Sequence, residues 1–334
     1  MSGKTVKKWL ITGGCGFIGL NLLSKLKCEG GNFVRIVDNL AVGSPGDLAG
    51  ISEFAEVGAG SLSESPQPGE VELVVGDITD DGLALKIVDN IDIIVHLAAN
   101  TGVAPSVEDP RYDCLTNVIG TLNYLEAARL SEVKRFVFAS SGAPVGECEP
   151  PIHEELPPHP VSPYGASKLA GEGYCSAYFR SFGVETVCLR FSNVYGPYSA
   201  KKSSIVAKFV RKSIKSQPLE IYGDGKQTRD FIHVDDLVDA IILSATREGI
   251  GGEIFQVATN QETSVSVLAD KLNALVAEFC PGSYSKIEHS GPRVGDVTRN
   301  FSDVSKAKEV LGWSPKIELD DGLREVVRWF VENK

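Results

Sequence analysis

The chain has 334 residues, of which 43% are hydrophobic, so it is long enough for one large domain or for a main domain with a smaller second one. Its formal net charge is -11, which argues against nucleic acid or an anionic membrane as a partner, because both require a basic surface. An anionic ligand would therefore have to be bound by arginine side chains placed locally.

The ends and the cysteines indicate where the protein resides. The first residues lead into a strand without an apolar leader, and no later stretch is long enough to span a membrane, so we expect a soluble, cytoplasmic protein. The seven cysteines are scattered, with no Cys-x-x-Cys pair and no histidine cluster nearby. We therefore predict reduced structural thiols, no disulfide framework and no metal site.

Apolar, β-rich runs alternate with helical patterns through the first half of the chain. The runs predict strands over 8–12, 33–37, 71–75, 91–96, 134–139 and 184–189, and the patterns predict helices over 17–29, 80–89, 115–130 and 164–182. This alternation predicts an α/β fold with a Rossmann-like, doubly wound parallel sheet. His96 ends a strand that is apolar on both faces, so we expect it to be a packed structural residue and not a ligand.

The first strand runs directly into a glycine-rich turn and a helix start. Gly13, Gly16 and Gly19 allow a tight turn and close approach of the backbone to a pyrophosphate, which the helix N-terminus favours. Asp38 ends the next strand, 19 residues after Gly19, where it can accept a hydrogen bond from a ribose 2′-hydroxyl. A carboxylate at this position disfavours a 2′-phosphate, so the pattern predicts NAD and not NADP.

Two further strand ends would lie along the same edge of the sheet. They supply the candidate cofactor residues Asp77, Ile78, Leu97, Ala98 and Ala99. For Asp77 the alternative is an ordinary loop aspartate or a helix cap.

Tyr164 and Lys168 are four residues apart at the start of a predicted helix, which places a phenol beside an ammonium group. Free tyrosine has a pKa near ~10, and a neighbouring positive charge would stabilise its phenolate form. Ser162 is the expected N-cap, and Pro163 suits the first helical position. The spacing alone is common on solvated helices, and it gains weight from the glycine turn and from the strand that ends at Ser141.

The segment between that strand and the helix carries seven prolines from 144 to 163, which predicts an extended loop. After residue 190 the pattern changes. We expect helices near 203–215, 234–247, 264–279, 303–311 and 321–333, and a strand over 253–257 that returns to the main sheet. The predicted organisation is therefore a cofactor-binding domain over 1–190 and a smaller, mainly substrate-binding lobe over 191–334.

Taken in order, these segments resemble the extended short-chain dehydrogenase/reductase family and, within it, the nucleotide-sugar epimerases of the UDP-glucose 4-epimerase type. The resemblance covers nearly the whole chain. It rests on the segments Thr12–Gly19, Asp38–Leu40, Gly76–Ile78, His96–Ala99, Asn117–Thr121, Ser140–Ser141, Tyr164–Lys168, Leu189–Pro197, Gly223–Gly225 and Thr228–Asp236.

The resemblance implies roles for particular residues. Ser141, Tyr164 and Lys168 would form the catalytic triad. The cofactor site would also include Phe17, Ile18, Asn39, Asn117, Tyr164, Lys168 and Phe191. The nucleotide sugar would contact Ser141, Tyr164, Asn193, Arg229, Arg293, Asp296 and Asn300. For Arg229 the alternative is a surface salt bridge with Asp230 or Asp235.

The implied reaction is an NAD-dependent 4-epimerisation through a 4-keto intermediate, with UDP-glucose and UDP-galactose or their N-acetyl forms as substrates. Related 4,6-dehydratases carry an acidic pair directly after the serine or threonine, where this chain has Gly142 and Ala143. That difference disfavours a dehydratase. A nucleotide-sugar dehydrogenase or reductase, a UDP-uronate epimerase and a non-catalytic NAD-binding protein remain as alternatives.

The resemblance also implies a homodimer, formed through the helices near 103–130 and 164–182.

Two departures from the family pattern concern the part of the site that would face the sugar. Val145 stands where the family commonly has a tyrosine, and Asn300 falls where some relatives carry a bulky tyrosine that restricts N-acetylated sugars. A smaller side chain at position 300 would admit them.

Overall fold

An eight-stranded sheet organises the first half of the chain. The computed structural model describes residues 6–291 and 298–333. The strand order is β12-β7-β6-β5-β1-β2-β4-β3. The strand bounds are β1 Lys7–Thr12, β2 Asn32–Asp38, β3 Ala55–Glu56, β4 Val71–Val75, β5 Ile93–His96, β6 Arg135–Ser141, β7 Thr186–Phe191 and β12 Glu253–Val257.

Strands β1 and β5 are neighbours, and both run parallel to the strands beside them. The direction in which the chain adds strands to the sheet reverses between them, so the topological switch point lies at their carboxyl ends. Ligands bind doubly wound sheets at that point. The expected fold class is confirmed, and β12 joins the sheet beside β7 as predicted.

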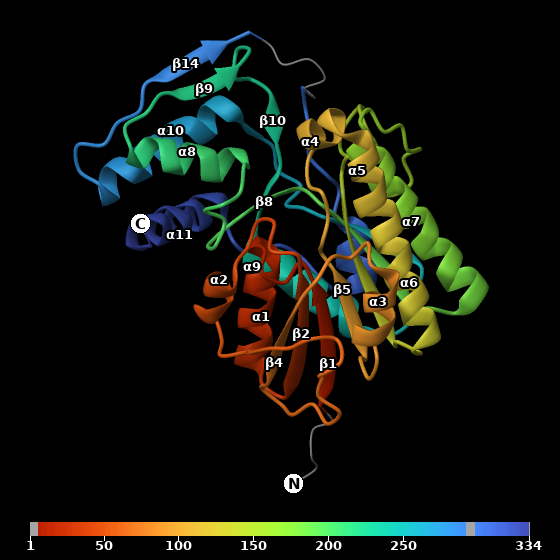
Figure 1. Cartoon of the computed structure of the whole chain (residues 1–334). Helices are drawn as coiled ribbons and strands as arrows, with labels where there is room; N and C mark the ends of the chain where they lie inside the picture. Colours follow the sequence, from red (N-terminus) through yellow and green to blue (C-terminus); the bar gives the residue numbers. More distant parts are fainter. Residues whose placement is uncertain (1–5, 292–297, 334) are drawn as a thin grey trace. The chain divides into compact units, whose positions relative to one another are not determined.

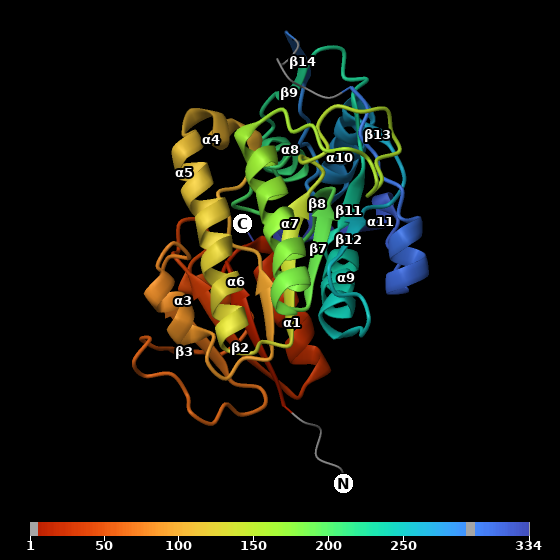
Figure 2. The ribbon, with the colours of Figure 1, turned by 90° about the vertical axis from the view of Figure 1, so that its right-hand side faces the viewer.

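Helices cover both faces of this sheet (Figures 1 and 2). Helix α1 packs on the face opposite to α6 and α7. Apolar residues of α3, α6 and α7 form one buried cluster with residues from the strands; Tyr124 of α6 and Phe136 of β6 are among its members. The helix bounds are α1 Phe17–Glu29, α2 Pro45–Ala49, α3 Asp81–Ile87, α4 Val103–Glu108, α5 Pro110–Cys114, the π-helical turn η1 Leu115–Ile119, α6 Gly120–Leu130 and α7 Pro163–Phe182.

The chain divides into two compact units. Unit 1 consists of Met1–Gly146, Pro157–Arg190 and Ala240–Phe255, and unit 2 consists of Glu147–Leu156, Phe191–Asp239 and Gln256–Lys334. Each unit has its own apolar cluster. The chain therefore crosses between the units several times.

Unit 2 is built from helices and short strands. Its core joins apolar faces of α8, α10 and α11, with Phe209, Leu272 and Phe330 among the buried residues. The further bounds are β8 Asn193–Tyr195, α8 Ile205–Ile214, β9 Leu219–Tyr222, β10 Thr228–Arg229, β11 Phe231–His233, α9 Val234–Thr246, β13 Thr263–Ser264, α10 Val265–Phe279, β14 Ile287–Ser290, the π-helical turn η2 Ala307–Leu311 and α11 Leu319–Glu332. The strands pair as β8–β11, β9–β14 and β10–β13.

The predicted helices and strands agree with the structure where the segments are long and strongly patterned. The proline-rich loop is also confirmed, because residues 144–162 form only turns, bends and isolated bridges. The pattern missed α2 and β3, which have five and two residues and are too short for a periodic signal. The helix expected over 303–311 begins later, because the Asp303 carboxylate accepts hydrogen bonds from the backbone N–H and hydroxyl of Ser305. Among the described residues, helices that are both long enough and apolar enough to cross a membrane are absent.

Candidate active site

The glycine turn between β1 and α1 lies against the segment that follows β5. Gly13 has φ +69°, and a Cβ atom there would lie 2.9 Å from the backbone nitrogen of Ala98. A Cβ at Gly19 would lie 2.5 Å from Cα of Gly14, so the helix can approach the turn only without a side chain. Helix α1 begins at Phe17 with Gly16 as its N-cap, and no side chain caps it. Its N-terminus therefore presents backbone dipoles to an anion.

Asp38 closes the next strand and organises this turn. Its Oδ2 accepts from the Cys15 N–H at 2.9 Å, and its Oδ1 accepts from the Leu40 N–H at 2.8 Å. Burial raises the pKa of Asp38, and the two backbone hydrogen bonds oppose that effect. An uncapped helix start beside a carboxylate at the end of β2 fits a dinucleotide such as NAD, because it offers a pyrophosphate site and a ribose acceptor.

The loop after β4 is tied to the loop after β2. Asp77 accepts a hydrogen bond from Asn39 Nδ2 at 2.9 Å, and its other oxygen accepts from the backbone N–H and hydroxyl of Thr79. Asp77 therefore has the local turn role that the sequence left open as an alternative. Ile78 is buried beneath it, within the apolar cluster of unit 1.

His96 is packed inside unit 1, as expected. Its Nδ1 lies 3.0 Å from the Thr12 hydroxyl and its Nε2 lies 3.2 Å from the Thr121 hydroxyl, while its ring stacks with Phe136 and Phe138. Burial, together with the positive charge of Lys168, lowers the pKa of His96 to about 3. The ring is therefore neutral and links strand ends and helices without acting as an acid.

Ser141, Tyr164 and Lys168 meet at the carboxyl end of β6, which is next to β5 in the sheet. Ser162 caps α7 by accepting from the Gly165 N–H at 3.1 Å, so the predicted cap is confirmed. The Ser141 hydroxyl accepts a hydrogen bond from the Ala143 N–H at 3.2 Å, and its interaction with the Tyr164 hydroxyl favours the ionised form of Tyr164. The Lys168 ammonium donates to the Ala139 carbonyl at 2.8 Å and lies 5.9 Å from the centroid of the Tyr164 ring.

The electrostatics of this trio correct one expectation. The sequence predicts a phenol whose pKa is depressed by Lys168. Instead, burial raises the pKa of Tyr164 to about 12, opposed by the hydrogen bond from Ser141 and reinforced by the charge of Asp113. Burial also lowers the pKa of Lys168 to about 8, against the opposing effects of nearby Asp113, Glu172 and Cys175. Burial outweighs the spacing, because Lys168 is buried and Tyr164 is half-buried, so both groups lose hydration.

Asn117 lies in the π-helical turn η1, and its side chain reaches both neighbouring segments. Its Oδ1 accepts from the Asn100 N–H at 2.8 Å, and its Nδ2 approaches Ser167 Oγ at 3.2 Å. Single π-helical turns inside helices often mark functional positions. Asn100 directly follows the Leu97–Ala99 segment that was predicted to contact the cofactor.

Three predicted nucleotide-sugar residues that the structure describes, Asn193, Arg229 and Asn300, belong to unit 2, whereas Ser141 and Tyr164 belong to unit 1. Asn193 begins β8 and donates from Nδ2 to the Asp230 carbonyl at 3.2 Å. Arg229, in β10, donates from Nη1 to the Thr228 carbonyl. Phe191 ends β7. Asn300 is half-buried. Its segment is held beside β10 by a hydrogen bond from the Thr228 N–H to the Thr298 carbonyl. Arg293 and Asp296 lie outside the described residues.

The two residues directly after Ser141, Gly142 and Ala143, carry no acidic group. Within the described part of the chain, no atom lies within 4 Å of the position that a Cβ at Gly142 would take. Val145 is buried, and its carbonyl accepts from the His159 N–H at 3.2 Å.

Sequence reasoning missed two buried acidic residues near the trio. Glu172 accepts from Ser140 Oγ at 2.6 Å and pairs with Arg190 at 2.8 Å. Asp113 accepts from Asn117 Nδ2 at 2.9 Å. A signal was present for each, because Glu172 stands one helical turn after Lys168 and Asp113 one turn before Asn117.

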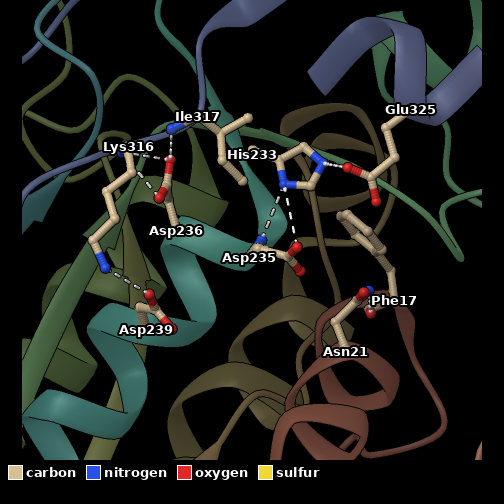
Figure 3. Close-up of polar contacts among 9 residues, drawn as sticks. All are labelled: Phe17, Asn21, His233, Asp235, Asp236, Asp239, Lys316, Ile317 and Glu325. Atoms are coloured by element: carbon tan, nitrogen blue, oxygen red, sulfur yellow. Dashed lines mark hydrogen bonds and ion pairs between the residues drawn. The ribbon is translucent and has the colours of Figure 1, made fainter. Parts of the chain in front are cut away.

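A cluster of titratable groups occurs in unit 2 (Figure 3). The buried His233 accepts from the Asp235 N–H at Nδ1, with the Asp235 carboxylate 3.9 Å from Nδ1 and the Glu325 carboxylate 3.7 Å from Nε2. The ring therefore sits between two carboxylates. The expected lack of a metal site stays a prediction.

Comparisons with known proteins agree with this geometry. The model of the NAD dependent epimerase/dehydratase family matches residues 9–258. A putative UDP-glucose 4-epimerase of Methanocaldococcus jannaschii is 38% identical, over 97% of this chain and 98% of the relative. A UDP-glucose 4-epimerase of Mycolicibacterium smegmatis is 34% identical, over 96% of this chain and 97% of the relative.

Among solved structures, a UDP-glucose 4-epimerase from Thermotoga maritima, crystallised with UDP-glucose, is 33% identical with a TM-score of 0.85. The match covers 98% of this chain and 99% of that one. The resemblance read from the sequence motifs is confirmed, and this chain belongs to the NAD dependent epimerase/dehydratase family, with NAD as its cofactor.

Proposed function

We propose that the protein is an NAD-dependent UDP-sugar 4-epimerase, which inverts the C4 hydroxyl of a UDP-hexose. The observation that carries this proposal is that Ser141 ends β6 close enough to Tyr164 of α7 to favour the ionised form of its hydroxyl, while the Lys168 ammonium lies 5.9 Å from the Tyr164 ring. These groups lie in the same unit as the glycine turn and Asp38, at the carboxyl edge of one sheet. Relatives named UDP-glucose 4-epimerase match over nearly the whole chain.

The protein groups perform the proton transfers of this reaction. Tyr164, as phenolate, accepts the proton of the sugar 4-hydroxyl, while Ser141 hydrogen-bonds to the same oxygen. NAD, when bound, would accept the hydride from C4 and return it to the opposite face of the 4-keto carbon once the sugar has rotated. Tyr164 then returns the proton to the same C4 oxygen. No net oxidation results.

The nucleotide would be held by unit 2 and the cofactor by unit 1. In this proposal Asn193 and Arg229, together with Arg293 and Asp296, bind the diphosphate and its ribose, since planar guanidinium donors suit phosphate oxygens. Asn300 borders the sugar, and its size admits N-acetylated hexoses. UDP-glucose and UDP-galactose, or their N-acetyl forms, are therefore the proposed substrate pairs.

A 4,6-dehydratase needs an acid and a base for the elimination of water. Gly142 and Ala143 offer neither, and no side chain of residues 6–291 or 298–333 fills the space beside Gly142. This supports epimerisation over dehydration. A nucleotide-sugar dehydrogenase remains the alternative to be separated by experiment.

The decisive experiment incubates the purified protein with a panel of UDP-sugars and follows interconversion at C4 by NMR. Protein denatured beforehand is tested for released NAD. We expect 4-epimers to form without added cofactor and without steady growth of NADH absorbance. Stoichiometric NADH formation would indicate a dehydrogenase instead, and a 4-keto-6-deoxy product would indicate a dehydratase.

The proposed assembly is a homodimer through the helices near 103–130 and 164–182, which are α4, α5, η1, α6 and α7. These helices expose apolar side chains that would be covered by a second copy, including Val107, Tyr112, Leu115, Ile119 and Phe182. Leu115→Glu should then yield a monomeric mass in solution, whereas Val267→Glu, at an exposed position of α10, should not.

A cytoplasmic location is also proposed, since all seven cysteines are free thiols.

A further inference from the structure

A fully buried carboxylate lies at the junction of two short strands of unit 2. Asp230 follows β10 and precedes β11, and the residue is 0% exposed. Arg229, one of the residues proposed above to hold the nucleotide, directly precedes it in the chain. Ionised carboxylates are almost never fully buried unless hydrogen-bond partners stabilise them, so the partners of Asp230 show what its burial achieves.

Both carboxylate oxygens of Asp230 bind the segment that follows β12. Oδ1 accepts from the Thr259 N–H at 2.8 Å and from the Thr259 hydroxyl at 2.6 Å, and Oδ2 accepts from the Asn260 N–H at 3.0 Å. Asn260 has φ +59°, a left-handed backbone conformation that is uncommon outside glycine. Asp230 therefore fixes the shape of this turn through both of its oxygens.

The segment that carries Asn300 reaches the same carboxylate. Ser302, two residues later, donates its backbone N–H to Asp230 Oδ2 at 3.4 Å, the longest of these bonds. The segment also pairs with Ile152, which donates its N–H to the Phe301 carbonyl at 2.9 Å. Asp230 thereby helps to set the position of Asn300 relative to β10.

The backbone of Asp230 binds Asn193, the first residue of β8. Asn193 donates to the Asp230 carbonyl from its own N–H at 3.0 Å and from Nδ2 at 3.2 Å. Strands β8 and β11 run parallel, with Asn193 opposite Phe231. The three described candidates for nucleotide binding, Asn193, Arg229 and Asn300, therefore lie on chain segments that meet at Asp230.

A carboxylate suits this junction better than an amide does. Hydrogen-bond donors approach both oxygens of Asp230, Thr259 at Oδ1 and the backbone of Asn260 and Ser302 at Oδ2. An aspartate accepts at both positions, whereas an asparagine accepts at one and donates at the other. An amide at position 230 would therefore face donors on one side and lose the bonds there.

We propose that Asp230 is a positioning residue for the nucleotide, which holds the chain segments of the three candidates in the arrangement that binds a UDP-sugar. Being fully buried and negatively charged, Asp230 acts through these segments and not by contact with the diphosphate. The proposal rests on the nucleotide-binding role proposed above. Loss of the acceptor at position 230 should weaken nucleotide binding and spare the cofactor site, whose glycine turn and Asp38 belong to unit 1.

The test compares Asp230→Asn with a matched control in the same unit. Asp236 of α9 is 2% exposed, and its carboxylate likewise accepts from backbone N–H groups, those of Lys316 and Ile317 (Figure 3). Asp236→Asn thus removes the same kind of contact from segments that carry none of the three candidates.

For Asp230→Asn we expect the KM for the UDP-sugar to rise about 10-fold or more, with a smaller change in kcat, because binding is weakened and the proton-transfer groups are not altered. NAD released on denaturation should match the wild type. Asp236→Asn should lose stability and keep the wild-type KM. A fall in kcat at unchanged KM in Asp230→Asn would indicate a purely structural role and overturn the proposal.

A second readout does not depend on sugar turnover. Titration calorimetry of the NAD-loaded proteins with UDP, at a temperature where each variant is folded, should show an affinity about 10-fold lower for Asp230→Asn and unchanged for Asp236→Asn. Equal UDP affinity in the wild type and Asp230→Asn would contradict the proposal, as would equal losses in the two variants.

If Asp230→Asn does not fold, a pair of variants at Thr259 replaces it. Thr259→Val removes the hydroxyl that donates to Asp230 at 2.6 Å, and it should lower the affinity for UDP about 5-fold. Thr259→Ser retains a hydroxyl and should keep the wild-type affinity. Equal affinities in the two variants would count against the role of Asp230.

The two proposals can fail separately. A wild type that binds UDP and epimerises no UDP-sugar would contradict the proposed function alone, since the UDP affinities would still decide the role of Asp230. A wild type that binds no UDP would overturn the nucleotide site and the role of Asp230 together.

Discussion

The Lys168 ammonium donates a 2.8 Å hydrogen bond to the carbonyl of Ala139, two residues before Ser141 on β6. This bond ties the α7 helix to the strand end that carries the catalytic serine. Lys168 also lies 4.9 Å from the centroid of the Phe138 ring on the same strand. These contacts hold the Lys168 ammonium in place, and they replace the water that would otherwise hydrate it.

Lys168→Met should raise stability at neutral pH while abolishing most turnover. The folded-state pKa of about 8, against 10.5 for free lysine, corresponds to a burial penalty of about 3 kcal/mol. Loss of the hydrogen bond to the Ala139 carbonyl costs about 1 kcal/mol, so the expected net increase in the free energy of unfolding is about 2 kcal/mol. Because the folded-state pKa is depressed, the penalty is fully present below pH 8 and fades between pH 8 and 10.5.

The measurement is the melting temperature of wild type and Lys168→Met at pH 7 and near pH 10, at equal NAD concentration. The advantage of the variant should shrink as pH rises. An advantage that grows with pH would contradict the assigned burial of a charged lysine.

Tyr164→Phe should fold and retain NAD, yet lose turnover by about 100-fold or more, because the phenol oxygen that exchanges the proton is gone. Activity is measured by conversion of the UDP-sugar, and NAD is measured after denaturation. Tyr174→Phe removes a hydroxyl from the exposed side of the same helix and should behave as wild type. Near wild-type rates in Tyr164→Phe would remove Tyr164 as the base.

Gly19→Ala should lower both stability and NAD content. Its Cβ would lie 2.5 Å from Cα and 2.6 Å from the carbonyl oxygen of Gly14, so the backbone of the turn must shift, at a cost of about 1–3 kcal/mol. Gly58→Ala is the control, since no atom of the described residues lies within 4 Å of its Cβ position. Equal NAD content in both variants would mean that the turn does not hold the cofactor.

Glu172→Gln should destabilise the protein by about 3 kcal/mol, because it leaves the buried Arg190 without its carboxylate. The check is chemical denaturation at neutral pH. Glu288→Gln removes the partner of Lys286 from an exposed pair, and should cost less than about 1 kcal/mol. Similar denaturation midpoints for the two variants would show that the Glu172–Arg190 pair adds little.

Local chemistry explains how much of the fold could be read from the sequence. Apolar strands alternate with amphipathic helices, so the parallel sheet and nearly all long helices were predicted within a few residues. Ser162 and Pro163 mark the start of α7, since capping depends only on adjacent residues. Short elements such as α2 were missed because five residues carry no period.

The sequence by itself determined the family, the glycine turn, the Asp38 position and the Tyr164–Lys168 spacing, because each depends on residues close together in the chain. Only the tertiary structure decided the charge state of the site. Burial raises the pKa of Tyr164 and lowers that of Lys168, reversing the expectation from spacing. The approach of Asp113 to α7, 51 positions before Tyr164, likewise arises from helix packing. Desolvation and long-range packing depend on the whole fold, and no local pattern encodes them.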